Sequence, residues 1–211
     1  MRTIIATVLL SLLSGFAFAF QANHNAQKDF DTLLARVKKS DDSIDFAQLR
    51  RLYSQTDSYS PYGDSSKKEM YTALNNNDFK KARSLADEAL KENYLNIDAH
   101  FVKMIACDKL GEAACSAHHK YVAKGIIDSI LKSGDGKSLE SALFVISVAE
   151  EYAVVRVSGL RPVSQALNHS DGHSYDVLTV IDPNTKEEGK LYFNIDVIIA
   201  AERRLLEKKG R

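Results

Sequence analysis

The strongest constraint on the fold is a run of helical periodicity between Ser66 and Leu131, where two helix–turn–helix units follow each other. From Asn77 onward, apolar residues recur every three or four positions and charged residues fill the gaps, which places the two classes on opposite faces of a helix. Comparable spacing continues over residues 98–110, where Gly111 gives a stop signal, and over residues 113–131. We therefore expect helices packed side by side throughout this stretch.

The same stretch resembles the tetratricopeptide repeat family, in which small and large residues alternate so that neighbouring helices pack closely. Asn77-Asp78-Phe79 stands where that family has Gly-Asp-Tyr, and Gly111-Glu112-Ala113 repeats the turn about 34 residues later. His100 departs from the family pattern because it stands where Trp is usual. An ordinary antiparallel helix bundle has the same periodicity and stays the alternative. Both interpretations predict a helical region over residues 27–132.

The character of the sequence changes after a glycine-rich junction at residues 133–138. Val, Ile, Tyr and Phe dominate four later runs, which we expect to form two hairpins: residues 142–148 with 152–157, and 175–181 with 190–195. A longer connection separates the hairpins, and a final helix is expected over residues 197–209. Helices followed by strands indicate an α+β fold, with a small antiparallel sheet and a C-terminal helix in residues 138–211.

The first 19 residues have the pattern of a secretory signal peptide. A basic start is followed by an apolar run of about 15 residues, which is short for a membrane span, and then by the small-x-small site Ala17-Phe18-Ala19. A transmembrane anchor is the alternative. We expect cleavage near Ala19, a mature chain without a transmembrane anchor, and a periplasmic or secreted location.

The charge balance of the sequence bears on the class of partner, and its two cysteines bear on a possible disulfide. The chain carries 28 basic and 28 acidic residues without a long basic run, which argues against nucleic acid as a partner. Cys107 and Cys115 lie on either side of Gly111, so an antiparallel helix pair can bring them face to face. An exported chain meets an oxidising compartment, which favours a disulfide; two small buried thiols are the alternative.

Phosphate-binding and metal-binding motifs are incomplete. Gly136-Lys137-Ser138 would need a glycine at position 131 to form a phosphate-binding loop, and Leu131 stands there. His169 and His173 alternate with polar residues in one loop, but loop histidines without a metal are far commoner than metal sites of this kind. We expect no cofactor and no bound metal.

The one paired-carboxylate cluster near potential cleft residues is Glu150-Glu151-Tyr152, with Arg156 beyond it. On the expected strand the two carboxylates point to opposite faces, so at most one of them can act as an acid or base toward a given partner. A charged turn is the simpler explanation of the cluster. No catalytic signature emerges.

Taken whole, the chain resembles a family of exported bacterial proteins known only as a domain of unknown function (number 4919). The resemblance covers most of residues 28–196 and is carried by short motifs that occur in order: Asp45-Phe46-x-x-Leu49-Arg50, Tyr59-x-Pro61-Tyr62, Ser133-Gly134-Asp135-Gly136-Lys137-Ser138, Val145-Ile146-Ser147-x-x-Glu150-Glu151-Tyr152, Gly172-His173-Ser174-Tyr175-Asp176 and Leu191-Tyr192-Phe193-Asn194-Ile195. It implies an exported protein and supplies no activity.

If the sheet builds a ligand site, the residues to test are those in these motifs: Glu151, Tyr152, His173, Tyr175, Asp176 and Asn194. The alternative is that they are turn and packing residues. We expect a non-enzymatic protein-interaction or assembly module whose partner is another envelope or secreted protein or peptide. A ligand-binding or hydrolytic domain, with its site in the C-terminal sheet, is the other interpretation.

Overall fold

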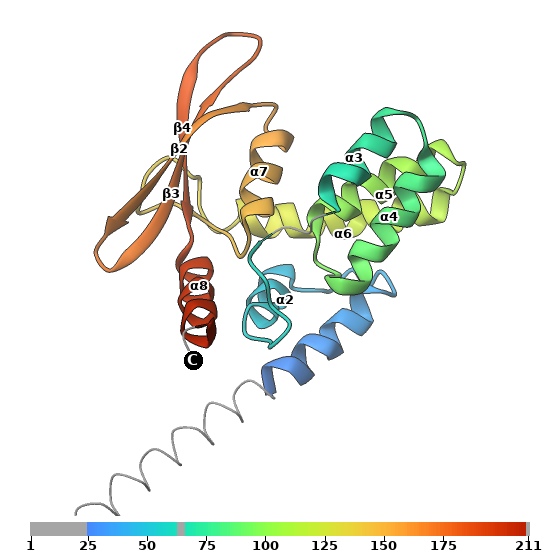
Figure 1. The fold of residues 1–211 in the computed structure, drawn as a ribbon, viewed down its shortest axis with the longest axis horizontal. Coiled ribbons are helices and arrows are strands. Elements are labelled where there is room, and N and C mark those ends of the chain that lie inside the picture. Colours follow the sequence, from blue (N-terminus) through green and yellow to red (C-terminus); the bar gives the residue numbers. More distant parts are fainter. Residues whose placement is uncertain (1–24, 63–65, 210–211) are drawn as a thin grey trace, which may run out of the picture. The chain divides into compact units, whose positions relative to one another are not determined.

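A computed structural model of the 211-residue chain describes residues 25–62 and 66–209 (Figure 1). The expected signal peptide, residues 1–19, lies outside this part of the chain. Contacts divide the chain into two compact units: the first holds described residues 25–44 and 48–59, and the second holds residues 45–47 and 60–209. We describe each unit by itself.

The first unit contains a helix over residues 25–37 and most of α2 (Phe46–Tyr53). Phe30, Val37 and Leu49 are buried, and the Phe30 ring lies 5.4 Å from the Tyr53 ring, centroid to centroid. The periodicity of the sequence explains this because apolar side chains recur on one face of each helix. The chain turns after residue 37 through Ser40, whose φ is 55°.

Four helices open the second unit: α3 (Lys67–Asn75), α4 (Phe79–Glu92), α5 (Ile97–Lys109) and α6 (Ala113–Leu131). They confirm the expected helices, and each packs against the next. Side chains cap two of them, since Asp78 accepts a hydrogen bond from Lys81 N and Asn96 from Ala99 N. Small residues such as Ala82, Ala86 and Ala106 are fully buried, which lets neighbouring helices approach closely.

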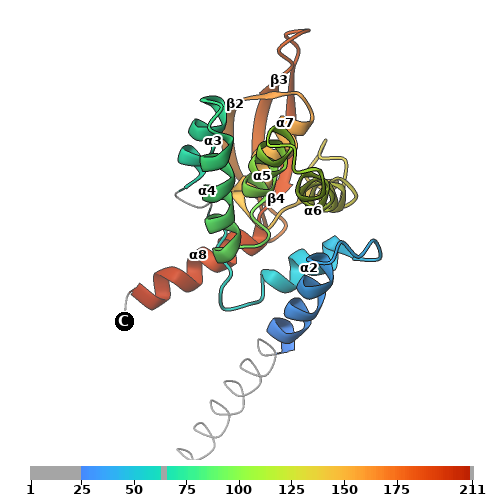
Figure 2. The ribbon, with the colours of Figure 1, turned by 90° about the vertical axis from the view of Figure 1, so that its right-hand side faces the viewer.

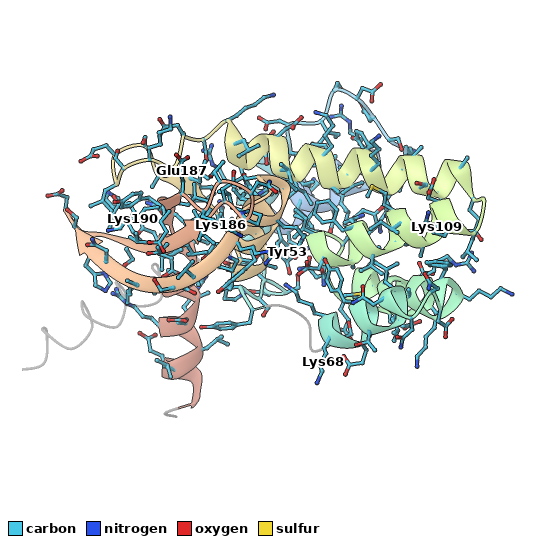
Figure 3. The ribbon with its side chains drawn as sticks, turned by 90° about the horizontal axis from the view of Figure 1, so that it is seen from above. Tyr53, Lys68, Lys109, Lys186, Glu187 and Lys190 are labelled. Carbon is cyan, nitrogen blue, oxygen red and sulfur yellow. A yellow bond between two sulfur atoms is a disulfide. The ribbon has the colours of Figure 1, made fainter. Side chains whose placement is uncertain are left out.

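The sheet has four strands in the order β1-β4-β3-β2. Their bounds are β1 (Leu143–Phe144), β2 (Arg161–Ser170), β3 (His173–Ile181) and β4 (Glu188–Asn194). β2, β3 and β4 pair antiparallel, but β1 pairs parallel to β4, so the sheet is mixed rather than purely antiparallel. α8 (Asp196–Lys209) follows β4, as expected, and completes an α+β fold. Lys186 and Glu187 lie exposed in the turn between β3 and β4 (Figure 3).

The expected hairpin over residues 142–157 is wrong. Its second half is a helix, α7 (Val148–Val157), capped by Ser147, whose side chain accepts from Glu150 N. Figures 1 and 2 show α7 between the sheet and the helices, where it packs against α5, α6 and β2. Burial on several sides explains its apolar composition, which is not that of a half-exposed helix.

The expected connection between the hairpins is also wrong, because β2 occupies most of it. The turn from β2 to β3 is Asp171-Gly172, with φ values of 51° and 82°, the positive values that a tight two-residue hairpin turn requires. Across the described residues, no helix combines the length and apolar character needed to span a bilayer.

Candidate functional site

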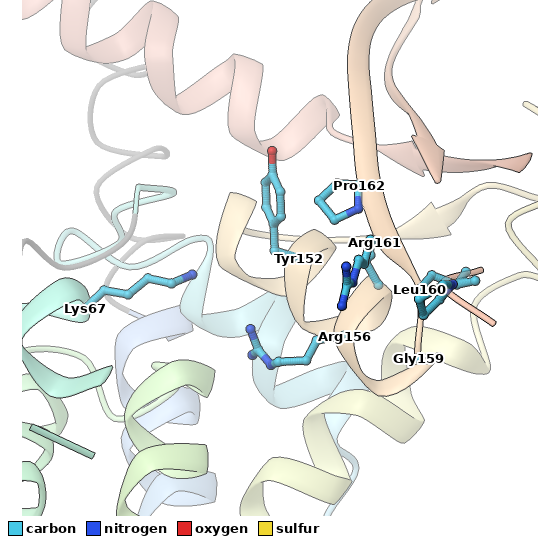
Figure 4. A pocket seen from close by; sticks show the side chains of 9 residues that line it. Lys67, Tyr152, Arg156, Gly159, Leu160, Arg161 and Pro162 are labelled. Atoms are coloured by element: carbon cyan, nitrogen blue, oxygen red, sulfur yellow. The ribbon is translucent and has the colours of Figure 1, made fainter. Parts of the chain in front are cut away.

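A basic pocket of about 460 Å³ opens in the second unit, between α3, α7 and the start of β2 (Figure 4). Three of the residues that line it are cationic: Lys67, Arg156 and Arg161. Figure 4 shows Lys67 and Arg156 pointing toward one another from α3 and α7. Tyr152 lines the same pocket, which places one of the sequence-predicted site residues in its wall.

The turn at the end of α7 positions the two arginines. Gly159 has a φ of 71°, and the N–H groups of Gly159 and Leu160 donate to the carbonyls of Arg156 and Val155. This ends the helix and sends the chain directly into β2. Arg156 therefore enters the pocket from the last turn of α7, and Arg161 enters it from the first residue of β2.

Asp98 holds two of the three cations in place. Its carboxylate, which is buried, lies 2.7 Å from Lys67 Nζ and 3.0 Å from Arg156 Nη2, and it accepts a 2.9 Å hydrogen bond from the Tyr71 hydroxyl. The Arg156 guanidinium also lies 5.1 Å from the centre of the Phe101 ring. One negative charge thus orients two positive ones, whose side chains remain about two-fifths exposed.

Arg161 adds a third positive charge without adding a negative one. Within the described part of the chain, no acidic side chain forms an ion pair with it. The pocket therefore carries more positive charge than its one buried carboxylate neutralises. An anion that enters it meets hydrogen-bond donors already held in position.

Behind the pocket wall lies a buried pair of carboxyl groups, Glu151 and Asp176. Glu151 is fully buried, and among the described residues neither of its oxygens makes a hydrogen bond of normal geometry, although the Asp176 carboxyl group lies close to it. Burial is the main cause of the raised pKa of Glu151, and the neighbouring carboxyl groups of Asp176 and Glu150 add to it, so that the pKa is about 9. Burial also raises the pKa of Asp176. Near neutral pH, Glu151 is therefore protonated and uncharged.

Gln165 connects this pair to the pocket. Its Nε2 donates to Asp176 Oδ2 at 2.6 Å, and its Oε1 accepts from the Tyr152 hydroxyl at 3.1 Å. The sequence-predicted residues Glu151, Tyr152 and Asp176 are thus brought into one neighbourhood by α7, β2 and β3. Glu150 has a different role, because its Oε2 accepts from Ile146 N at 2.8 Å and holds the chain just before α7.

The other sequence-predicted residues gather around Asp196, at the start of α8. His173 Nδ1 lies 2.6 Å from Asp196 Oδ2, and Asn194 Nδ2 donates to the same oxygen at 3.2 Å. Burial alone would raise the pKa of Asp196. Hydrogen bonds outweigh this effect and lower the pKa, first the bond from Ser174 N and then the bond from His173. The Tyr175 ring lies 6.3 Å from that of His173. These contacts tie β3 and β4 to α8, so the predicted set falls into two groups.

Several residues of the pocket were not identified from the sequence. Lys67, Asp98 and Arg161 are far apart in the chain and share no spacing, so only the packing of α3, α5 and β2 brings them together. The sequence does not indicate Gln165, because its strand lacks the alternation of apolar and polar residues that marks a half-buried strand. The one local signal in the sequence is that two arginines, Arg156 and Arg161, stand on either side of the helix-ending Gly159.

Cys107 and Cys115 form a disulfide that joins α5 to α6 across the Gly111 turn. Among the described residues, they and Glu112 make up the one group of three potential metal ligands close enough to share an ion. Both sulfur atoms are already bonded to each other, so this group is a covalent link between two helices rather than a metal centre.

Comparisons with known proteins give a family and no activity. Neither a search of curated proteins nor a search of solved structures found a match. A family described as Domain of unknown function (DUF4919) matches residues 20–204, which include all described residues of the first unit, most of the second unit and every residue that lines the pocket. The chain therefore belongs to the DUF4919 family.

Proposed function

We propose that this chain is an exported, non-enzymatic binding module that holds an anionic group of another envelope or secreted protein or peptide in the basic pocket. The observation that carries the proposal is that Lys67 and Arg156 pair with one buried carboxylate, whereas Arg161 forms no ion pair with any acidic side chain in residues 25–62 and 66–209. Cations fixed in this way need little reorganisation to receive an anion, which favours binding.

The composition of the pocket supports binding rather than catalysis. Its lining consists of the three cations, one tyrosine, two prolines, a glycine and two aliphatic residues, and it contains no Ser, Cys or His. The lining therefore offers no Ser–His or Cys–His pair for nucleophilic catalysis. One observation favours the hydrolytic alternative, namely the raised pKa of Glu151, but that carboxyl group is fully buried.

Binding of small anions tests the pocket directly. We expect inorganic phosphate or acetate, added at constant ionic strength, to raise the melting temperature of the protein; saturation at about 100 times Kd adds about 2.7 kcal/mol to the free energy of unfolding. Arg161→Gln should abolish most of this rise. Arg204→Gln removes one exposed cation from α8 instead and should respond as the parent does.

Equal responses from the two variants would show that the anions act through net charge and not through the pocket. No response of the parent to either anion would count against the proposed function. Both variants keep Asp98 and its partners, so neither should disturb the fold.

Export is the second part of the proposal and rests on the signal-peptide pattern of the first 19 residues. N-terminal sequencing of the protein recovered from its host's envelope or medium should give a chain that begins at Phe20. Recovery of the full-length chain from the cytosolic fraction would overturn this part and leave the pocket unaffected.

A further inference from the structure

We propose that the anion received by the basic pocket is the C-terminal carboxylate of an extended polypeptide segment, which pairs with the free edge of β2. This inference rests on the proposed function and names the ligand class. Three observations carry it: an unpaired edge strand, the direction of its main chain, and the position of the cations at one end of that edge.

β2 is the outermost strand of the sheet and has no strand on its outer side among the described residues. It is ten residues long, and nine of them are exposed. Val163 and Leu167 leave more than half of their side-chain surface in contact with solvent. Long edge strands are usually protected by charges, by proline or by a bulge, because their free N–H and C=O groups attract other strands.

Here that protection is confined to one end of β2. Pro162 and an irregularity in the pairing between Pro162 and Ser164 interrupt the strand near its start. From Ser164 to Ser170 there is no Pro, Lys, Arg, Asp or Glu. About six residues of regular edge are therefore open to an added strand.

The hairpin shows which main-chain groups face outward. A two-residue turn closes on the pair Ser170 and His173, which in such a hairpin exchange hydrogen bonds with each other. Hydrogen-bonded and non-bonded pairs then alternate along the ladder. The N–H and C=O of Leu167 consequently point away from β3, toward the free edge, and so do those of Gln165.

The direction of β2 determines that the C-terminal end of an antiparallel ligand strand reaches the basic pocket. An added strand that runs antiparallel to β2, the slightly more stable arrangement, starts beside Ser170 and finishes beside Arg161. Arg161 and Pro162 are the first two residues of β2 and also line the basic pocket. The carboxyl end of the ligand therefore arrives where Arg161, Arg156 and Lys67 can bind it.

The test uses two libraries of short synthetic peptides of random sequence, one with free C-terminal carboxylates and one with C-terminal amides, screened against the mature protein. We expect ligands from the carboxylate library, with a loss of about tenfold in affinity when a selected peptide is amidated. Arg161→Gln should weaken the same peptides by a similar factor, and Arg204→Gln should not. Equal yields from the two libraries, or no ligand from either, would overturn the inference.

A second pair of variants tests whether the ligand pairs with the edge of β2. Leu167→Pro removes an outward N–H while leaving the β2–β3 ladder intact, so we expect about a tenfold loss of peptide affinity. Leu167→Thr changes the same side chain but keeps its N–H, and the difference between the two variants isolates the main-chain bond. Binding of peptides to Leu167→Pro as tightly as to Leu167→Thr would refute pairing at this edge.

The two proposals fail in different ways. If phosphate or acetate stabilises the parent but not Arg161→Gln, and no peptide depends on Leu167 N–H, the pocket binds anions and the strand-pairing inference is wrong. If neither small anions nor peptides bind, the proposed function fails as well. Circular dichroism of each variant shows whether the fold survives the substitution.

Discussion

Glu151 is the residue whose environment departs furthest from what its chemistry prefers. It is fully buried on α7, its oxygens make no hydrogen bond of normal geometry among the described residues, and its pKa is raised to about 9. In the unfolded chain a glutamate has a pKa near its usual value of about 4.3, so the folded state binds more protons between these two values. Stability must then fall as pH rises through this window.

The first prediction follows from that sign. Between pH 5 and pH 9, Glu151 should lower the free energy of unfolding by roughly 1 kcal/mol for each pH unit. Glu151→Gln places a permanently neutral group in the same space, so we expect it to flatten this dependence and to be more stable than the parent at pH 8. Urea unfolding at several pH values measures both effects. A variant with the same slope as the parent would mean that Glu151 is ionised in the folded state.

Gly125 is the second residue that the packing singles out. A Cβ placed on it would overlap the ring of Phe46, which lies directly against α6 in the second unit. Gly125→Ala should therefore force the ring to move and cost about 1–3 kcal/mol of stability. Gly189→Ala is the matched control, because a Cβ there meets nothing within 4 Å. Urea midpoints that shift equally for the two variants would contradict this account.

At the scale of elements, the helices of residues 66–131 could be predicted because their stabilising pattern is local. Phe79, Ala82 and Ala86 repeat on one face, and Asp78 and Asn96 cap the helices from adjacent positions. The β3–β4 hairpin and α8 were predictable for the same reason. α7 was not, because its β-branched residues suggested a strand, whereas burial against both the sheet and the helices suits them equally well.

Local sequence patterns predict neither β2 nor the basic pocket. Apolar and polar residues do not alternate along β2, because both of its faces are largely exposed. The strand therefore lacks the usual sequence signal of a half-buried strand. The Asp171-Gly172 turn was the better clue. Lys67, Asp98 and Arg156 meet only through packing among α3, α5 and α7, and nothing in their sequence spacing indicates that contact.

The cap of α7 gives a prediction at this scale. The Ser147 side chain accepts from Glu150 N, and this bond starts the helix that carries Glu151, Tyr152 and Arg156. Ser147→Ala should cost about 1 kcal/mol of stability, within the usual range for a lost cap. Ser147→Asp keeps an acceptor at the same place and should retain most of it. Thermal unfolding compares the three proteins, and equal losses for Ala and Asp would show that the cap contributes nothing.

At the scale of the whole molecule, the disulfide bears on the proposed export. Cys107 and Cys115 are joined by a disulfide. Disulfides persist in oxidising compartments and are rare in the cytosol. This disulfide closes a short loop around Gly111, and the loss of chain entropy that this imposes on the unfolded state corresponds to roughly 2–3 kcal/mol of stability. The disulfide would therefore stabilise the chain in an oxidising compartment and would be lost in a reducing one.

The last prediction joins these two properties. Protein recovered from the envelope or medium should show no alkylatable thiol before reduction, and a reductant should lower its melting temperature by several degrees. The double variant Cys107→Ala/Cys115→Ala should melt near the reduced parent and should not respond to the reductant, which separates loss of the bond from other effects of the chemical. Two free thiols in the exported protein would show that α5 and α6 are held by packing alone. The fold of the helical region would then have to be stable without a covalent link.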